Sequence, residues 1–254
     1  MPRFISVLIV LCLLSINCRA AEQSDSARVV ADSFSSSSSF RQYKFNGRQL
    51  IAPGAMLAVG IAGIYTFDGF KKSVNRHLAG HRPTNADSFL EFVTPAAYLG
   101  LGFIPGLKQR FDWRSRLLAG ATAYAVMVVT SSAMKAAFHE ERPDGSDSRS
   151  FPSGHSAVAF TGAELMRIEY GNWVGLAGYA VATTVGILRL YNNRHWLNDI
   201  LGGAAIGILS ARIAYWLLPL EQRLFRLDRS PRGTTASIFP VIGATNGISF
   251  AMTF

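Results

Sequence analysis

Apolar stretches of helical length alternate with short polar connections along most of this chain. The best uninterrupted stretch runs from Arg116 to Met134, close to the roughly 20 residues that a helix needs to cross a hydrocarbon core. The other helical segments are residues 50–67, 89–107, 156–169, 173–190 and 196–220. The pattern predicts an all-α, six-helix, membrane-embedded bundle over residues 50–220.

Three of these segments carry features that are uncommon in lipid-facing spans. Pro95 and Pro105 divide segment 89–107, so this segment can lie against the bundle without crossing the bilayer. Segment 156–169 contains Glu164 and Arg167, and the last helix contains Arg212. These charges leave the depth of both helices in the membrane open.

The first 20 residues (1–20) have the form of a signal peptide. Arg3 precedes an apolar run, and Cys18-Arg19-Ala20 offers a small-x-small cleavage site. We expect cleavage after Ala20; the alternatives are lipidation at Cys18, which Asn17 disfavours, and an uncleaved anchor. Residues 21–49 are polar and contain a run of five serines, a composition that predicts a flexible tether.

Residues 221–254 form a C-terminal tail with a different pattern. Residues 237–242 and 248–254 alternate between apolar and other side chains, and Asn246-Gly247 lies in the connection between them. Asn-Gly is a preferred sequence for the tight turn of a β-hairpin. The tail therefore predicts a short C-terminal β-hairpin.

Composition narrows the class of protein. Of the 254 residues, 49% are hydrophobic and 16% are charged, which excludes a disordered or fibrous chain. A formal net charge of +9 would attract nucleic acid, anionic lipid or a phosphorylated substrate. The cations are scattered through polar connections and are not interleaved with aromatic residues, so we expect a membrane protein and no nucleic-acid partner.

Two cations stand where the helix 116–134 ends. Lys135 is followed seven residues later by Arg142-Pro143. A phosphate is the partner that accepts both a point charge and a planar guanidinium fork. The alternative role for the pair is an anchor at the membrane edge.

A second cluster, Pro152-Ser153-Gly154-His155, precedes the next helix. Ser153 can cap that helix, Gly154 lets the backbone approach a ligand, and the free amides of a helix start attract anions. His155 can donate a proton near neutral pH. A capped helix start without a ligand remains the alternative.

A third cluster joins Arg189 to His195 and Asp199. Residues four apart share a helix face, so Asp199 can accept the Nδ1 proton of His195 and leave Nε2 free as a nucleophile. Because successive helices reverse direction, all three clusters converge on one end of the bundle. The combination predicts phosphoryl transfer without a metal or another cofactor.

In order and spacing, these clusters resemble the three signature motifs of the type 2 phosphatidic acid phosphatase superfamily. The resemblance covers about residues 50–220. It implies that His195 attacks phosphorus and becomes a phosphohistidine, that Asp199 orients it, and that His155 protonates the leaving group. It also implies a phosphate-binding role for a further set of residues: Lys135, Arg142, Ser153, Gly154 and Arg189.

Two positions depart from the pattern of that superfamily. Leu188 stands where a serine commonly precedes the arginine, and Asn192-Asn193-Arg194 replaces a glycine that often precedes the histidine. The first change could weaken a supporting contact. Neither change affects a residue to which the resemblance assigns a catalytic or phosphate-binding role.

The exported, apolar character and residues 191–196 are similar to the Gram-negative envelope branch of the superfamily. This implies a phosphatase in the inner membrane, facing the periplasm, whose substrate is lipid A, phosphatidylglycerophosphate, phosphatidate or undecaprenyl diphosphate. The alternatives are a soluble periplasmic acid phosphatase, a vanadium haloperoxidase and a phospholipid-binding membrane protein. The sequence predicts neither the lipid nor the oligomeric state.

The expected topology contains a conflict. Cleavage after Ala20 leaves the new N-terminus outside, and three crossings before Lys135 then place the active site in the cytoplasm. A periplasmic site requires that segment 89–107 does not cross, or that the signal is not cleaved. The basic connection from Lys108 to Arg116 favours an inside position for the start of the next helix.

Overall fold

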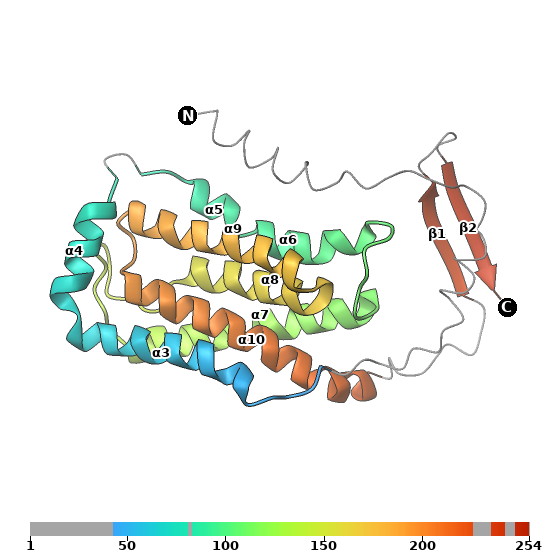
Figure 1. Cartoon of the computed structure of the whole chain (residues 1–254), viewed down its shortest axis with the longest axis horizontal. Helices are drawn as coiled ribbons and strands as arrows, with labels where there is room; N and C mark the ends of the chain where they lie inside the picture. The colour runs from blue at the N-terminus through green and yellow to red at the C-terminus, as the bar shows by residue number, and fades with distance from the viewer. Residues whose placement is uncertain (1–42, 81–82, 226–234, 242–246, 254) are drawn as a thin grey trace. The chain divides into compact units, whose positions relative to one another are not determined.

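The structure is a computed structural model that describes residues 43–80, 83–225, 235–241 and 247–253. Most of the described chain is helical (Figure 1). The helices, with one 3₁₀ turn, are α3 (Arg48–Thr66), α4 (Asp68–Leu78), α5 (Ala86–Leu90), α6 (Val93–Gly100), η2 (Leu101–Phe103), α7 (Trp113–Ala137), α8 (Gly154–Tyr170), α9 (Asn172–Tyr191) and α10 (Leu197–Leu224).

The predicted number of six helices is wrong. Among the described residues, seven α-helices are eight or more residues long, and the additional one is α4. Its sequence is mostly polar, but Asp68 in the first turn and Arg76 in the last turn suit the helix dipole. Lys71 and Asn75 lie four residues apart and form its buried side. The buried side of α4 is thus polar, so a search for apolar periodicity misses it.

The long segments run back and forth between two ends of the bundle. The site end is where α7 and α9 finish and where α8 and α10 begin; the opposite end is the far end. Helix α3 runs toward the site end, because Gly63 near its last turn lies against Asn198 at the start of α10. The backbone N–H groups of Arg110 and Phe111, just before α7, bond Glu169 near the end of α8, which fixes that connection at the far end.

Segment 89–107 is divided as its prolines predict. Pro95 lies in the first turn of α6, where a missing N–H is tolerated, and Pro105 follows η2. The segment is not among the helices long and apolar enough to span a membrane. It nevertheless carries the chain from the site end to the far end, because Glu91 contacts His155 and Gly102 lies against Arg116.

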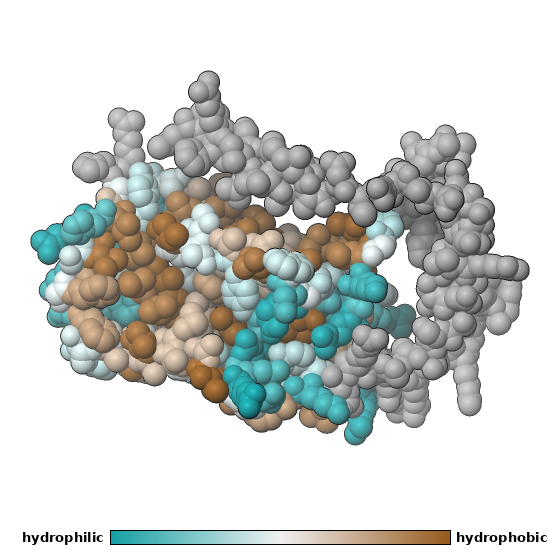
Figure 2. All heavy atoms as spheres, viewed as in Figure 1, coloured by the Kyte–Doolittle hydropathy of each residue, from teal (hydrophilic) through white to brown (hydrophobic). Residues whose placement is uncertain are grey.

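Four helices among the described residues have the length and hydropathy of membrane spans: α3, α7, α9 and α10. Exposed apolar side chains such as Val59, Val129 and Ile187 cover their outer surfaces. Figure 2 shows hydrophobic side chains gathered over much of one face of the helical body. A surface of this kind is expected where a protein contacts lipid.

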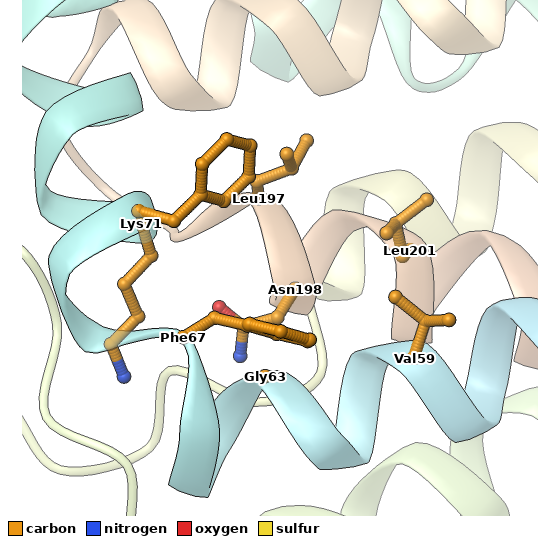
Figure 3. A pocket seen from close by; sticks show the side chains of 8 residues that line it. Val59, Gly63, Phe67, Lys71, Leu197, Asn198 and Leu201 are labelled. Carbon is orange, nitrogen blue, oxygen red and sulfur yellow. The ribbon is translucent and has the colours of Figure 1, made fainter.

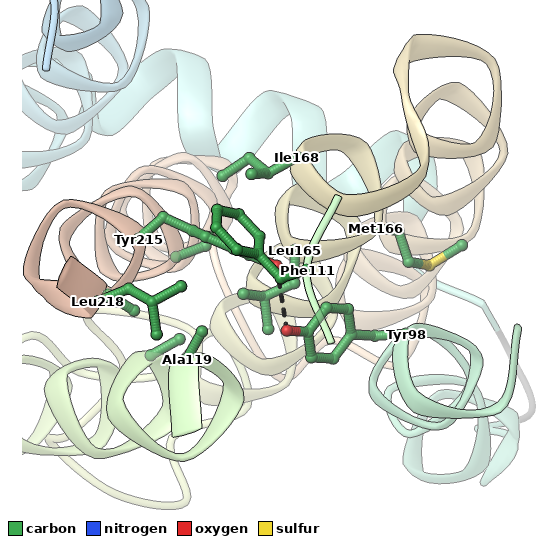
Figure 4. Close-up of a cluster of buried hydrophobic side chains, with 11 residues drawn as sticks. Tyr98, Phe111, Ala119, Leu165, Met166, Ile168, Tyr215 and Leu218 are labelled. Carbon is green, nitrogen blue, oxygen red and sulfur yellow. Dashed lines mark hydrogen bonds between the residues drawn. The ribbon is translucent and has the colours of Figure 1, made fainter. Parts of the chain in front are cut away.

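Helix α8 is the central helix, and most of its side chains are buried between α6, α7, α9 and α10. Helix α10 approaches it very closely, since a Cβ at Gly203 would overlap the carbonyl oxygen of Ser153 and one at Gly207 would overlap that of Ala157. Toward the far end, the main apolar core gathers around Tyr98, Leu165 and Tyr215 (Figure 4), with the two tyrosine hydroxyls 3.1 Å apart.

Two strands lie in the C-terminal tail: β1 (Thr235–Val241) and β2 (Gly247–Thr253). They pair antiparallel, from Thr235 opposite Thr253 to Val241 opposite Gly247. They overlap the two segments in which the sequence predicts a hairpin, whereas residues 242–246 of the connection lie outside the described residues. The expected signal peptide and most of the expected tether (1–42) lie outside them as well. Arg48 and Gln49, which the tether was expected to include, belong to α3.

Candidate active site

The predicted site residues come together at the site end of the bundle. Lys135 lies in the last turn of α7 and Arg189 in the last turn of α9. His155 lies in the first turn of α8, and Asp199 in the first turn of α10. A backbone hydrogen bond of 3.0 Å from Ser153 N–H to the Asp199 carbonyl joins the two helix starts.

His195 and Asp199 form a buried pair. The Nδ1 atom of His195 lies 3.2 Å from Oδ2 of Asp199, and their side chains are 2% and 0% exposed. The same carboxylate oxygen accepts the backbone N–H of Trp196 at 2.8 Å and the hydroxyl of Ser150. The aspartate is therefore held in place independently of its contact with the imidazole. Nε2 is the ring nitrogen of His195 that is left to react with a ligand.

The start of α8 has the predicted cap and an open space beside it. The Ser153 hydroxyl oxygen accepts the backbone N–H of Ser156 at 3.4 Å. A Cβ at Gly154 would meet no atom within 4 Å, so a ligand has room there to approach the backbone. Unpaired N–H groups in the first turn of a helix favour an anion in such a space.

Each of the three cations is held by an oxygen atom. Arg189 pairs with Asp87 at 2.5 Å, and both side chains are buried. Arg142 pairs with Asp147 at 2.8 Å, and Lys135 donates to the carbonyl of Arg149 at 2.8 Å. These contacts set the directions of the long side chains in advance, which lowers the entropy lost when an anion binds.

The pKa values of the two histidines are lowered by the same groups. Burial, and then the charge of Arg189, lower the pKa of His155 to about 4; Arg142 and Lys135 act in the same direction, and Asp87 opposes them. Burial and the same three cations hold the pKa of His195 well below its usual range. The same three cations thus disfavour a positive charge on either ring.

Sequence reasoning missed two acidic residues of the site. Glu91, in the turn before α6, places Oε1 3.4 Å from Nε2 of His155. Glu140, in the connection after α7, lies 2.9 Å from Lys71 and accepts the Asn198 amide. Burial and the nearby charge of Asp199 raise the pKa of Glu140 to about 7, although its bond with Lys71 opposes this. Neither glutamate lies in a recognisable motif, and Lys71 and Glu140 are 69 positions apart.

An apolar cavity of about 500 Å³ adjoins this end of the bundle (Figure 3). Val59, Phe67 and Leu201 form part of its wall, and Lys71 and Asn198 form its polar edge. The described residues contain no group of three or more His, Cys, Asp or Glu side chains placed to hold a metal ion.

Comparison with known proteins identifies the family. The sequence model of the PAP2 superfamily matches residues 54–223, and the chain belongs to this superfamily. With four candidate spans among the residues that the structure describes, it is a membrane protein.

Individual relatives share parts of the chain. A lipid A 1-phosphatase of Porphyromonas gingivalis is 39% identical over 179 residues, which cover 66% of this chain and 39% of that protein. The chain thus spans about two fifths of the length of that relative. A putative undecaprenyl-diphosphatase of Escherichia coli is 32% identical over 126 residues, covering 44% of this chain and 64% of that one.

A solved structure also matches part of the chain. It is a transmembrane PAP2-type phosphatidylglycerolphosphate phosphatase from Bacillus subtilis, with a TM-score of 0.48 and 20% identity. The match covers 72% of this chain and 99% of that one.

Proposed function

We propose that this protein is a metal-independent phosphatase that removes a phosphate from a membrane lipid. The observation that carries the proposal is the buried His195–Asp199 pair, at the end of the bundle where Lys135, Arg142, Arg189 and His155 also lie. A nucleophile, an orienting carboxylate, an anion site and a proton donor are the parts that phosphoryl transfer needs.

In the proposed first step, Nε2 of His195 attacks phosphorus while the bond to the leaving oxygen breaks. Asp199 stabilises the imidazolium that forms, as it does in hydrolases that use a histidine held by an aspartate. Lys135, Arg142 and Arg189, with Ser153 and the Gly154 amide, hold the phosphate oxygens. Positive charge placed in advance around the phosphate stabilises the transition state.

In the proposed second step, water attacks the phosphohistidine and releases inorganic phosphate. His155 donates a proton to the leaving group in the first step and removes a proton from water in the second. An oxyanion in the site offsets the charge of the three cations that lower the pKa of His155. Substrate binding therefore promotes the protonation of the residue that must act as an acid.

Three observations support a lipid as the substrate. Four helices are candidate spans, and an apolar cavity adjoins the site end. The Porphyromonas relative is named a lipid A 1-phosphatase. We infer that the substrate belongs to the same chemical class, a phosphorylated lipid, with lipid A 1-phosphate as the first candidate and undecaprenyl diphosphate, phosphatidylglycerophosphate and phosphatidate as the others.

We also propose that the protein lies in the inner membrane with the site facing the periplasm. The far-end connection carries Lys108 and Arg110, and Arg114 follows in the first turn of α7. Positive charges that flank a membrane span favour the cytoplasmic side. This orientation places residues 43–47, which precede α3, in the cytoplasm, because segment 89–107 carries the chain from the site end to the far end. It is therefore incompatible with the cleavage after Ala20 that the sequence predicts, which would leave the new N-terminus outside.

Lys108→Cys and Ser146→Cys, both at exposed positions, test this orientation in a protein whose two native cysteines, Cys12 and Cys18, are replaced by serine. Only the Ser146→Cys variant is expected to react with an impermeant maleimide in spheroplasts.

The activity is tested by phosphate release from the purified protein in detergent, with EDTA present, on the four candidate lipids and an aryl phosphate. Activity on a lipid is expected, and His195→Ala is expected to lose at least about a thousand-fold of it. His77→Ala, which changes an exposed histidine on α4, is the matched control. Preference for the aryl phosphate would favour a soluble-type acid phosphatase, and no release from any substrate would overturn the proposal.

A further inference from the structure

A buried carboxyl group outside the three motifs contacts the proposed acid of the reaction. Oε1 of Glu91 lies 3.4 Å from Nε2 of His155, and the two side chains are 11% and 29% exposed. An imidazole has two nitrogens, and the one that faces Glu91 is not available to a substrate. Nδ1 is left as the nitrogen that can reach a leaving group.

The fold anchors the Glu91 turn on both sides. Asp87, one turn earlier on α5, is almost fully buried and bonds Arg189 of α9 and the Asn192 amide. Shortly after Glu91, the Thr94 hydroxyl donates to the carbonyl of Ala159, one turn beyond His155 on α8. The turn is therefore fixed to the two helices that carry Arg189 and His155.

Most charges around His155 disfavour its protonated form, so a carboxylate beside the ring would stabilise that form. Arg189 from α9, Arg142 from the loop before α8 and Lys135 from α7 all disfavour a charged ring, while Asp87 from α5 favours one. The charges of Arg189 and Asp87 also act on Glu91, which contacts His155. Of the two acidic groups near the ring, Glu91 is the one within contact distance of a ring nitrogen.

We propose that Glu91 is the positioning residue for His155: its carboxylate accepts the Nε2 proton, directs Nδ1 toward the leaving group and stabilises the imidazolium that acts as the acid. This inference rests on the proposed function, because it assigns a partner to the acid of that reaction. The same pairing of a carboxylate with a histidine fixes tautomer and orientation in hydrolases and metal sites.

The proton balance of the reaction is complete with water as the second reactant. In the first step, the Nδ1 proton moves to the leaving oxygen as the P–O bond breaks and the P–N bond to His195 forms. The ring is then neutral and keeps its Nε2 proton, which is hydrogen-bonded to the Glu91 carboxylate. In the second step, water gives a proton to Nδ1 while its oxygen bonds phosphorus and the P–N bond breaks, which restores the imidazolium.

The test compares leaving groups in Glu91→Gln, which keeps the size of the side chain and removes its charge. An alkoxide leaving group needs a proton and p-nitrophenolate does not. We expect phosphate release from phosphatidate to fall about 10- to 100-fold, while release from p-nitrophenyl phosphate falls only a few-fold. The alkaline limb of the kcat profile on phosphatidate is expected to move to lower pH, because the ring loses its proton more readily.

Two further variants complete the experiment. Glu141→Gln neutralises an exposed glutamate and is expected to behave as wild type. In a His155→Ala background, Glu91→Gln is expected to add little, because Glu91 acts through His155. Glu91→Asp keeps the charge and is expected to recover part of the activity on phosphatidate.

The outcomes separate the two proposals. Equal losses on both substrates, a further loss in the His155→Ala background or no effect of Glu91→Gln would overturn the role of Glu91, while wild-type activity would still support the phosphatase. If wild type releases no phosphate from any substrate, the proposed function itself fails. Should Glu91→Gln fold poorly, Glu91→Asp provides a weaker form of the comparison, because its shorter side chain moves the charge away from the ring; a loss on phosphatidate that exceeds the loss on p-nitrophenyl phosphate is again expected, and equal losses would overturn the role of Glu91.

Discussion

The ammonium nitrogen of Lys71 lies 2.9 Å from Oε1 of Glu140, and both side chains are buried. Lys71 comes from α4, and Glu140 comes from the connection that carries Arg142. Glu140 also accepts the amide of Asn198, the residue next to Asp199. The ion pair therefore joins α4 to the start of α10, where the carboxylate that holds His195 is located.

The first prediction concerns this ion pair. Lys71→Met removes the cation and leaves Glu140 buried beside Asp199, two acidic groups that disfavour each other. Breaking one side of a buried pair costs about 3 kcal/mol or more, so we expect a clear loss of thermal stability in detergent and a lower kcat. Lys72→Met removes an exposed neighbour on the same helix and is expected to change neither. Equal behaviour of the two variants would mean that the pair is not important.

The second prediction concerns the approach of α10 to α8. A Cβ at Gly203 would overlap the carbonyl oxygen of Ser153, the residue that caps α8 and borders the anion site. We expect Gly203→Ala to cost about 1–3 kcal/mol of stability through overpacking and to lower phosphatase activity by displacing Ser153. Gly54→Ala on α3 is the control, since a Cβ there meets no atom within 4 Å. Unfolding temperature and phosphate release are measured on both, and an active, stable Gly203→Ala variant would contradict the expectation.

Local signals account for what the sequence predicts well. Long apolar runs place α7 and α9 within a few residues of their observed bounds, because length and hydropathy are properties of one segment. The contact between His195 and Asp199 is predicted correctly, but not for the expected reason, because His195 precedes the helix. Trp196 is the N-cap of α10, and Asp199 in the first turn reaches back to the Trp196 N–H and to the ring of His195. Helix α4 is missed because its buried side is formed by Lys71 and Asn75.

Long-range contacts account for what the sequence does not predict. Asp87 lies 102 positions before Arg189, and Glu91 lies 64 positions before His155. No spacing rule connects residues so distant, because the contact depends on where the short helices α5 and α6 pack. A buried glutamate in a short connection gives no local pattern that separates it from a solvated one.

The third prediction concerns Glu91 and pH. Burial raises the pKa of Glu91 from an ordinary 4.5 to about 7, with Arg189 opposing and Asp87 adding to the effect. Between these values the substrate-free folded protein holds on Glu91 a proton that the unfolded chain has released. The carboxylate that pairs with the His155 imidazolium forms when this proton passes to Nε2 of His155. The contribution of Glu91 to stability is therefore full below pH 4.5 and is lost as pH rises to about 7, a change of about 3 kcal/mol.

A glutamine at position 91 is neutral at every pH. We expect Glu91→Gln to unfold with a flatter pH dependence than wild type and at a higher temperature than wild type at pH 8. Unfolding temperatures at pH 5 and pH 8 in the same detergent measure this, with Glu141→Gln as the exposed control. Parallel curves for wild type and Glu91→Gln would show that Glu91 is not protonated in the folded protein.

The fourth prediction concerns the charges inside α8 and α10. Glu164 is completely buried, and Arg167 and Arg212 each bond it at 2.6 Å, with the Tyr179 hydroxyl also donating to it. The sequence leaves the depth of these helices open because of such charges. In the structure the charges face one another inside the bundle, so the outer surface of α10 remains apolar enough for a membrane span.

Arg212→Met leaves part of the Glu164 charge without its partner and is expected to cost about 3 kcal/mol. The double variant Glu164→Gln with Arg212→Met is expected to regain part of this loss, because it removes the uncompensated charge as well. Arg212 lies 13 residues beyond Asp199 on α10, about 20 Å along the helix axis, so the kcat of the folded fraction is expected to stay near the wild-type value.

Arg223→Met, at an exposed position of the same helix, is the control for the loss of a positive charge. Thermal unfolding and phosphate release per folded molecule distinguish the two effects. A lower kcat in a fully folded Arg212→Met variant would mean that the far half of α10 influences the site. A double variant less stable than Arg212→Met alone would mean that Glu164 contributes through its bonds with Arg167 and Tyr179, independently of Arg212.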